Sequence, residues 1–486
     1  MSFDYDVIIL GSGPAGFSCA MQSSKFDKRV LMVEANEEHL GGTWINSGTV
    51  PSKALREAAK SIQKFHVQFG DERGRKPYER FKMNDLLQYK QNILESKNQK
   101  VKNDIIKNEI DTARGWGTIL DDHTVEVKDH LNNVNTYSAK NILISTGSSF
   151  NSPDMFSIND SNILDYRSVL NLTHIPRRMV IVGNGIISYE FATIFAALGT
   201  RVTLLADTDE LLPFLDDEIK QEMNRLLKES TIQLHNNVHL QHVSNNKLRT
   251  CTEVGFKTDA DPDRLQVVET EHVLYVGSRT PNTSKIGVEN VDLSLNKEGS
   301  IKVDSHFRTS TQNIYAAGDV VGSPAQASVS FVQGRIAALS MFNDESNKMN
   351  ESIPYGIYSI PEISAIGMTE RGAIQQGIDV TVGRAYYNNL TQADINHESD
   401  GLLKLVFRSD DLKLIGVHII GEYASDLIHL GQSVMAQNGS IRYFMEHVLN
   451  YPTYSEAYRI AAFNGMNRVY KAGIKYKKIL ERSDKD

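Results

Sequence analysis

A glycine-rich loop that ends in a lysine is the first stretch of this sequence with the means to do chemistry. It reads Gly41-Gly42-Thr43-Trp44-Ile45-Asn46-Ser47-Gly48-Thr49-Val50-Pro51-Ser52-Lys53. Proline fits the first turn of a helix, so a helix is predicted to begin at Pro51. Lys53 then lies in that first turn, where a cation gains nothing from the helix dipole. This favours a partner or a functional role for Lys53; a solvated surface lysine is the alternative.

Two other stretches have the order of a dinucleotide-binding fingerprint, in which a strand, a glycine-rich turn and a helix follow one another. In the first, the apolar strand 5–10 leads into Gly11, Gly13 and Gly16, a helix follows, and a second strand ends at Glu34. The glycines allow a tight turn and close approach of a pyrophosphate, the helix N-terminus faces phosphate, and the acid can bind ribose hydroxyls. Because all the parts occur in sequence, the pattern predicts a dinucleotide site.

The second stretch repeats this pattern with the same spacing. Strand 179–182 is followed by Gly183, Gly185 and Ser188, a helix, and strand 201–205. From Gly11 to Glu34 is 34 − 11 = 23 residues, and the same step from Gly183 reaches position 206, an alanine, with Asp207 next. Serine at 188 is small enough to permit close helix packing. Two such turns imply two nucleotide cofactors.

Composition excludes several other classes of protein. The chain has 486 residues, 40% of them hydrophobic, which is enough for about three domains. Its net charge is 52 − 60 = −8, and no basic run suggests nucleic-acid binding. Cys19 and Cys251 are its only cysteines, so no disulfide framework is expected, and Cys19 is predicted to be inert core. We predict no metal and no membrane span, and hence a cytoplasmic protein.

Over residues 4–470 these patterns resemble the pyridine nucleotide-disulfide oxidoreductases, the class I flavoproteins that include dihydrolipoamide dehydrogenase. In that family the glycine-rich loop carries two cysteines, five residues apart, beside a flavin. Here Trp44 and Thr49 occupy those positions. Neither an indole nor a hydroxyl can relay electrons to a disulfide as a thiolate does. The resemblance therefore implies the family's scaffold without its usual relay.

The chain is most similar to the soluble, FAD-dependent pyridine nucleotide transhydrogenases. The shared segments are Pro-Ser-Lys-Ala-Leu-Arg at 51–56, Gly-Ile-Tyr-Ser-Ile-Pro-Glu-Ile-Ser at 356–364 and Asn-Tyr-Pro-Thr at 450–453. That subgroup typically keeps the first cysteine of the loop, where this chain has Trp44. The tryptophan is expected either to pack on the flavin or to narrow access to it.

The resemblance also implies site residues. Lys53 and Glu190 would form an ion pair beside flavin N5 that stabilises the reduced cofactor, although Glu190 could instead be a glutamate favoured at a helix start. The FAD-binding positions would be Gly11, Gly13, Gly16, Glu34, Gly42, Thr43, Thr146, Gly147 and Asp319. Those for the nicotinamide nucleotide would be Gly183, Gly185, Ser188, Asp207 and Gly277.

A C-terminal segment, like the glycine-rich loop, lacks a residue that the family uses for disulfide chemistry. Relatives that act on disulfides have a histidine before the proline of this segment, and a later glutamate orients it in the partner subunit's active site. This chain has Tyr451 and Glu456 there. Tyrosine, with an ordinary pKa of about 10, is a poor base at neutral pH. Thiols and base are thus missing together, and we expect a structural role for Glu456.

The residues after the second fingerprint bear on nucleotide choice. Members of the family that prefer NADP place arginines there for the 2'-phosphate, whereas this chain has Asp207, Asp209 and Glu210. Three acids would repel a phosphate, and Asp207 could accept from a ribose hydroxyl. NADH is therefore favoured as the donor, with NADP(H) as the alternative nucleotide.

The expected fold is α/β, with two Rossmann-like dinucleotide-binding domains and a C-terminal α+β dimerisation domain. Its expected parts are an FAD domain in two pieces (1–150 and 276–350), an NAD domain (151–275), a dimerisation domain (351–470) and a charged tail (471–486). The expected assembly is a homodimer.

The expected activity is hydride transfer from NADH to FAD and on to a second nicotinamide nucleotide. The alternatives are an NADH-dependent reductase of quinone or oxygen, and a non-catalytic flavin-binding protein. Retention of Lys53 and Glu190 argues against the non-catalytic alternative.

Overall fold

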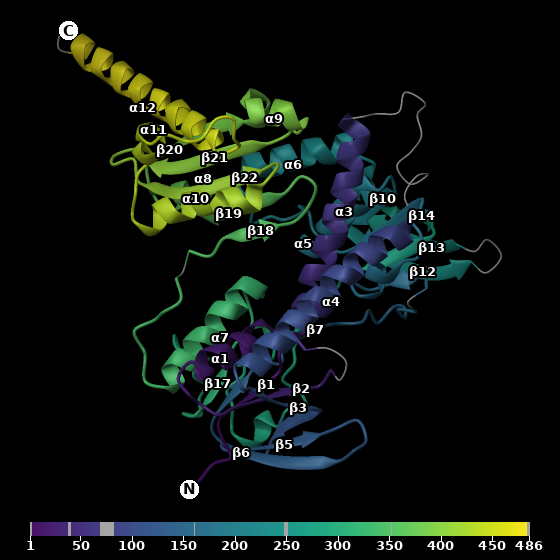
Figure 1. Cartoon of the computed structure of the whole chain (residues 1–486). Coiled ribbons are helices and arrows are strands. Elements are labelled where there is room, and N and C mark those ends of the chain that lie inside the picture. The colour runs from purple at the N-terminus through teal and green to yellow at the C-terminus, as the bar shows by residue number, and fades with distance from the viewer. Residues whose placement is uncertain are drawn as a thin grey trace.

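The computed structural model describes residues 2–36, 40–68, 82–159, 161–246, 251–350 and 352–483. Three sheets organise these residues, each with its own layer of helices (Figure 1). The sheet near the N-terminus lies at the bottom of that view, and the sheet near the C-terminus lies at the upper left. The expected fold class, with two Rossmann-like units and a C-terminal α+β unit, is confirmed.

The first sheet has the order β3-β2-β1-β6-β5-β4, and β17 also pairs with β6. Its strands are β1 Tyr5–Leu10, β2 Val30–Glu34, β3 Asp111–Arg114, β4 Trp116–Ile119, β5 Thr124–Lys128, β6 Val134–Ile144 and β17 Ile314–Ala316. Helices α1 (Pro14–Ser24) and α7 (Ala327–Met341) pack together beside it. Because β17 and α7 come from far along the chain, two separated segments build this unit.

The second sheet is parallel throughout and has the order β11-β10-β9-β15-β8. Its strands are β8 Ile163–Leu164, β9 Arg178–Val182, β10 Arg201–Leu205, β11 Ile232–His235 and β15 His272–Tyr275. Helices α5 (Ile186–Ala197) and α6 (Asp217–Glu229) follow β9 and β10. An antiparallel meander packs on this sheet through a shared apolar cluster; its strands are β12 Val238–Asn246, β13 Cys251–Thr258 and β14 Asp261–Thr270.

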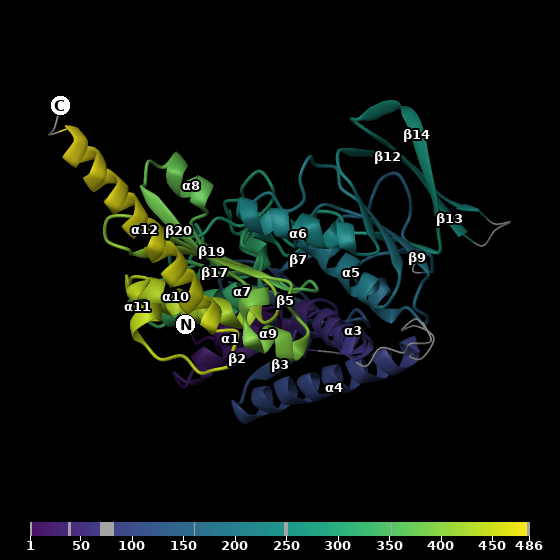
Figure 2. The same cartoon turned by 90° about the horizontal axis from the view of Figure 1, so that it is seen from above.

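The third sheet is antiparallel, with the order β18-β19-β22-β21-β20. Its strands are β18 Tyr355–Ile357, β19 Ile363–Gly367, β20 Val380–Tyr386, β21 Leu402–Arg408 and β22 Leu414–Ile420. The helices of this unit are α8 Glu370–Gln375, α9 Thr391–Asn396, α10 Ala424–Ala436, α11 Arg442–Glu446 and α12 Glu456–Ser483. Seen from above, α12 and the meander lie at opposite ends of the molecule (Figure 2).

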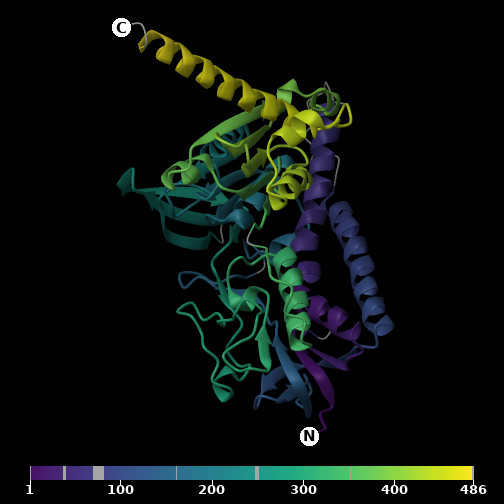
Figure 3. The same cartoon turned by 90° about the vertical axis from the view of Figure 1, so that its left-hand side faces the viewer.

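Two long helices connect the glycine-rich loop to the rest of the fold. A short helix, α2 (Thr43–Asn46), is followed by α3 (Thr49–Gln68), and α4 (Met83–Lys107) packs along α3 (Figure 3). A small two-stranded sheet of β7 (Ser148–Phe150) and β16 (Arg279–Pro281) joins the segments that enter and leave the second unit. The loop therefore lies where the first and second units meet.

Two elements differ from the sequence-based expectation. Helix α3 begins at Thr49, and Pro51 is still within its first turn, where the missing N–H has no helical partner in any case. Helix α12 runs through the expected boundary at residue 470.

Within the described ranges, no helix has the length and apolar character needed to cross a membrane.

Candidate active site

Lys53 of α3 and Glu190 of α5 meet at the wall of a cavity of about 1660 Å³. Lys53 Nζ lies 2.7 Å from Glu190 Oε2, and the side chains are 25% and 6% exposed. The backbone N–H of Tyr358 donates to Glu190 Oε1 at 2.8 Å, and Nζ lies 4.6 Å from the centre of the Tyr358 ring. Both carboxylate oxygens are thus occupied, which fixes a positive charge at the cavity wall.

Tyr358 was missed as a partner of this pair by the sequence reasoning, although its segment was noted. Burial raises the pKa of its hydroxyl, and the charges of Glu362 and Glu190 raise it further. The phenol therefore stays neutral around pH 7, and its ring lies beside the ammonium group. A cation over a neutral aromatic ring is attracted to the face of that ring.

Trp44 and Thr49, at the two positions that carry cysteine in the resembled family, have different surroundings. Thr49, the first residue of α3, lines the cavity together with Lys53. Trp44 is absent from the cavity wall; its ring packs edge-on against Phe331 of α7, with centroids 5.0 Å apart. Its buried Nε1 has no hydrogen-bond partner among the residues that the structure describes. Packing of Trp44 into the α7 side explains why this bulky residue leaves the cavity open beside Lys53.

Neither cysteine of the chain can replace the missing relay. Cys19 is fully buried in α1, and burial raises the pKa of its thiol to about 12. Cys251 begins β13 in the meander and does not line the cavity. The expectation that Cys19 is inert core is therefore confirmed, and the cavity wall carries no thiol.

The first fingerprint forms a cradle that accepts only glycine at its closest contacts. Gly11 has φ +102°, and a Cβ there would lie 2.5 Å from the Ser145 carbonyl oxygen. Gly42 has φ +62°, and its Cβ would lie 3.0 Å from the Cα of Gly13. At Gly13 itself a Cβ would meet no protein atom within 4 Å, so the space over the helix N-terminus is open. Such a cradle fits the pyrophosphate of a dinucleotide.

Glu34 is oriented by contacts that the sequence did not predict. Its Oε2 accepts from the Ser12 backbone N–H at 3.0 Å and from the Ser12 hydroxyl at 2.5 Å. Its Oε1 accepts from the Asn36 N–H at 2.8 Å. The Ser12 hydroxyl in turn accepts from the N–H of Gly41. Oε1 keeps a further lone pair, so the group can still bind a ribose hydroxyl.

The remaining predicted FAD residues lie where the first unit connects to β7 and β16. Thr146 and Gly147 precede β7, and the Thr146 hydroxyl donates to the Asn282 carbonyl at 2.8 Å. Asp319 Oδ2 accepts from the Ser148 hydroxyl at 3.0 Å and lies 3.2 Å from Arg279 NH2. Gly16 in α1 and Thr43 in α2 complete the set, and Thr43 lines the cavity.

The second fingerprint opens directly into the same cavity. Gly183 has φ +147°, and a Cβ there would lie 2.5 Å from the Val276 carbonyl oxygen, whereas Gly185 has no protein atom within 4 Å of that point. The buried Ser188 hydroxyl donates to the Gly185 carbonyl at 2.7 Å. Serine is thus accommodated at the third position of this fingerprint. Gly277, which follows β15, also lines the cavity.

Of the three acids that follow the second fingerprint, only Asp207 lines the cavity. Asn184, inside the fingerprint, donates to Asp207 Oδ1 at 2.6 Å. Glu210 is turned away to Lys220 of α6, at 2.9 Å. The repulsion expected of a 2'-phosphate at the cavity wall therefore comes from one carboxylate held in place, rather than from all three acids.

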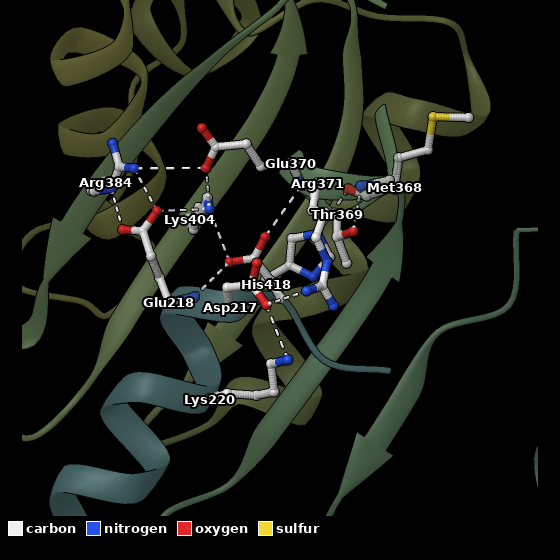
Figure 4. Close-up of polar contacts among 12 residues, drawn as sticks. Asp217, Glu218, Lys220, Met368, Thr369, Glu370, Arg371, Arg384, Lys404 and His418 are labelled. Atoms are coloured by element: carbon white, nitrogen blue, oxygen red, sulfur yellow. Dashed lines mark hydrogen bonds and ion pairs between the residues drawn. The ribbon is translucent and has the colours of Figure 1, made fainter. Parts of the chain in front are cut away.

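The loop that carries Asp207 is anchored at its far end by a buried ionic cluster (Figure 4). Lys404 of β21, 1% exposed, lies 2.9 Å from Asp216, 2.7 Å from Glu218 and 2.6 Å from Glu370. Asp216 also caps α6 by accepting from the Glu218 N–H. Arg384 of β20 pairs with Glu218. The cluster thus fixes the start of α6 against the third sheet.

This cluster predicts a dependence of stability on acid pH. Burial alone would raise the pKa of Glu218, but hydrogen bonds from Arg384 and Lys404 outweigh it and hold the pKa below the ordinary 4.5. A carboxylate with a lowered folded-state pKa contributes stability above its unfolded pKa and loses it as the pH falls. We expect the free energy of unfolding to decline from about pH 5 towards about pH 3, and less steeply in Glu218→Gln.

Urea unfolding across that pH range measures this effect. Glu298→Gln is the matched control, because Glu298 is exposed and its side chain forms no ion pair in the described part of the chain. The same pH slope in Glu218→Gln and in the unsubstituted protein would contradict the assignment.

The C-terminal segment that carries Tyr451 and Glu456 does not reach this cavity within the chain. Tyr451 is 67% exposed, and its hydroxyl lies 2.9 Å from that of Thr391. Glu456, at the start of α12, is 5% exposed and binds Arg459 at 2.8 Å. Neither residue lines the cavity. The ion pair with Arg459 agrees with a structural role for Glu456.

Among the described residues, no group of three or more histidine, cysteine, aspartate or glutamate side chains is arranged to hold a metal ion.

Comparisons with known proteins agree on one family. The family model "Pyridine nucleotide-disulphide oxidoreductase" matches residues 5–334, and the model of that family's dimerisation domain matches residues 353–462. The soluble pyridine nucleotide transhydrogenase of Azotobacter vinelandii is 37% identical over 479 residues, covering 96% of this chain and 99% of that protein. The protein of the same name from Stutzerimonas stutzeri is 37% identical over 478 residues, with the same coverage.

Solved structures show the same fold at lower identity. The HOCl-induced flavoprotein disulfide reductase RclA from Escherichia coli has a TM-score of 0.83 at 23% identity and covers 94% of this chain and 99% of its own. LpdA from Mycobacterium tuberculosis has a TM-score of 0.85 at 21% identity and covers 94% of this chain and 98% of its own.

Proposed function

This chain belongs to the pyridine nucleotide-disulphide oxidoreductase family, and we propose that it transfers hydride between two nicotinamide nucleotides through a bound FAD, without a disulfide relay. The protein is an FAD-dependent oxidoreductase and a homodimer, since it carries the family's dimerisation domain. The observation that carries the proposal is the ion pair of Lys53 and Glu190, kept at a cavity whose wall holds no thiol.

The residues of the first fingerprint are suited to hold FAD. Gly11, Gly13 and Gly42 leave the backbone open for a pyrophosphate, and Glu34 and Asp319 offer carboxylate oxygens to hydroxyl groups of the cofactor. FAD, when bound, supplies the two-electron chemistry, accepting hydride from one nicotinamide nucleotide and returning it to another. The overall reaction is NADH + NADP⁺ → NAD⁺ + NADPH, in which no proton is gained or lost.

The chain's own residues bind and orient the reactants. The Lys53 ammonium provides a fixed positive charge that favours negative charge on a reduced cofactor beside it. Glu190 orients the Lys53 ammonium through their ion pair, and the Tyr358 N–H fixes Glu190. The second fingerprint and Asp207 hold the nicotinamide nucleotide in the same cavity. Because that cavity is shared, the second nucleotide enters after the first has left, which is a ping-pong order.

Asp207 makes NADH the favoured donor. Its carboxylate can accept from a ribose 2'-hydroxyl, but it repels a 2'-phosphate. We expect Asp207→Asn to shift the ratio of kcat/KM for NADPH over NADH upward by about tenfold, the equivalent of about 1.4 kcal/mol. Initial rates with each donor measure this ratio. Asp209→Asn is the matched control, since Asp209 does not line the cavity, and an equal shift there would refute a local role for Asp207.

The acid at position 207 also supports a second candidate function. A nucleotide site that disfavours NADP suits an NADH-dependent reductase that passes electrons to a quinone or to oxygen. A non-catalytic flavin-binding protein would not need a charge pair at the cavity, so Lys53 and Glu190 argue against that third alternative.

Anaerobic mixing of the FAD-loaded protein with one equivalent of NADH tests the proposal. We expect the flavin absorbance to bleach and then to recover when thio-NADP⁺ or thio-NAD⁺ is added. Recovery only on admission of quinone or oxygen would overturn transhydrogenation in favour of the reductase. Absence of bleaching would overturn both and leave a binding role.

A further inference from the structure

A second hollow of about 600 Å³ lies on the second sheet, at the edge opposite the nucleotide cavity. Arg178 and Arg201, which line it, are the first residues of β9 and β10. Gly183 and Asp207 follow the other ends of the same two strands. Because β9 and β10 run parallel, the hollow and the nucleotide cavity occupy opposite edges of one sheet and are separate sites.

The two arginines are direct neighbours on one face of the sheet. The register pairs Arg201 with Arg178, so both side chains leave the sheet on the same side. Val180 and Leu205, two residues after Arg178 and four after Arg201, lie on the same face and pack under the meander, and Thr270 of β14 also lines the hollow. Like charges directly opposite each other on neighbouring strands are destabilising. An anion between them would remove this repulsion.

No acid of the described chain neutralises this pair. Both arginines are exposed, and neither side chain forms a hydrogen bond or an ion pair within the residues that the structure describes. Glu271, at the same edge, is engaged elsewhere: its oxygens accept from the Arg177 backbone N–H at 3.2 and 3.3 Å, and one lies 3.7 Å from His174 Nε2. In a chain of net charge −8, two adjacent cations without acidic partners stand out.

We propose that this hollow binds a phosphate group, carried by inorganic phosphate or by a phosphate monoester, between Arg178 and Arg201. A dianion matches two positive charges, and the planar guanidinium offers two parallel donors to phosphate oxygens. Thr203 and Gln233, paired with each other in the register, line the hollow beside the arginines and add a hydroxyl and an amide donor. The site is independent of hydride transfer and lies outside the proposed function.

Calorimetric titration of the FAD-loaded protein tests this site. Saturating NAD⁺ occupies the nucleotide cavity, and inorganic phosphate is the titrant, with glycerol 3-phosphate in a second series to separate the free ion from an ester. We expect one site per subunit, and about tenfold or greater weakening in Arg178→Gln and in Arg201→Gln, since each removes one charged hydrogen-bonding group.

Arg177→Gln is the matched control. Arg177 is adjacent in sequence and exposed like Arg178 and Arg201, and its loss changes the net charge equally, but it does not line the hollow. We expect its phosphate affinity to stay within about twofold of the unsubstituted protein. In phosphate-free buffer, Arg201→Gln is expected to melt above the unsubstituted protein, because the like-charge contact is gone. Equal weakening in all three variants, or no saturable binding in the unsubstituted protein, would overturn the site.

Discussion

Replacement of Lys53 by methionine is expected to slow NADH-dependent bleaching of the bound flavin by about 10²–10³-fold, the usual effect of losing one group that stabilises developing charge. Methionine keeps the length and apolar stem of lysine but removes the ammonium beside Glu190. Among the described residues, Glu190, 6% exposed, then keeps only the Tyr358 N–H as a hydrogen-bond partner for its negative charge at the cavity wall. Stopped-flow absorbance under anaerobic conditions measures the rate.

A second readout separates a role at the flavin from a merely structural one. Loss of a cation beside the cofactor should lower the midpoint potential of the flavin, because the reduced form loses stabilisation. Lys64→Met is the matched control: it lies on the same helix, but does not line the cavity. If Lys53→Met bleaches at the rate of Lys64→Met and keeps its potential, the ion pair has no part in hydride transfer.

The sequence predicted those parts of the site that local residue patterns specify. Glycines at fixed steps after a strand specify a turn and a helix start, so Gly11, Gly13, Gly183 and Gly185 could be placed without coordinates. The pairing of Lys53 with Glu190 came from the resemblance to a family, because no local spacing connects residues 137 positions apart.

The contacts that tune these residues escaped the sequence because their partners are backbone groups or short polar side chains. Ser12 fixes Glu34, Asn184 fixes Asp207, and the Tyr358 N–H fixes Glu190. Any residue supplies a backbone N–H, so nothing in the sequence marks the one that will be used. The orientation of the Trp44 side chain could not be predicted either, because its packing on Phe331 depends on how α2 and α7 meet.

The ionic cluster behind the Asp207 loop did leave a signal in the sequence. Lys404 interrupts an otherwise apolar strand, Leu402-Leu403-Lys404-Leu405-Val406-Phe407. Lysine is almost never fully buried unless it is paired, so a lysine at the centre of such a run predicts acidic partners. Asp216, one of those partners, is 188 positions away. The pattern could therefore predict that Lys404 has acidic partners but could not identify them.

Lys404→Met is expected to lower the free energy of unfolding by about 3–5 kcal/mol, the usual cost of removing one partner from a buried ion pair. The lysine and Asp216 are each 1% exposed, and without the ammonium Asp216 and Glu370 are left with less compensation for their charges. Equilibrium urea unfolding followed by circular dichroism measures the loss. Lys228→Met, at an exposed position near the end of α6, is the control and should stay within about 0.5 kcal/mol.

A double variant decides whether uncompensated charge or lost packing causes that destabilisation. If charge is the cause, adding Glu370→Gln to Lys404→Met should recover part of the lost stability, since one of the unpaired carboxylates is then neutral. If the losses in the free energy of unfolding from the two substitutions simply add, the destabilisation by Lys404→Met comes from poorer packing around the methionine. Because Asp216 caps α6 and ends the loop that begins at Asp207, charge-driven loss should also weaken NADH binding, and recovery of stability should restore it.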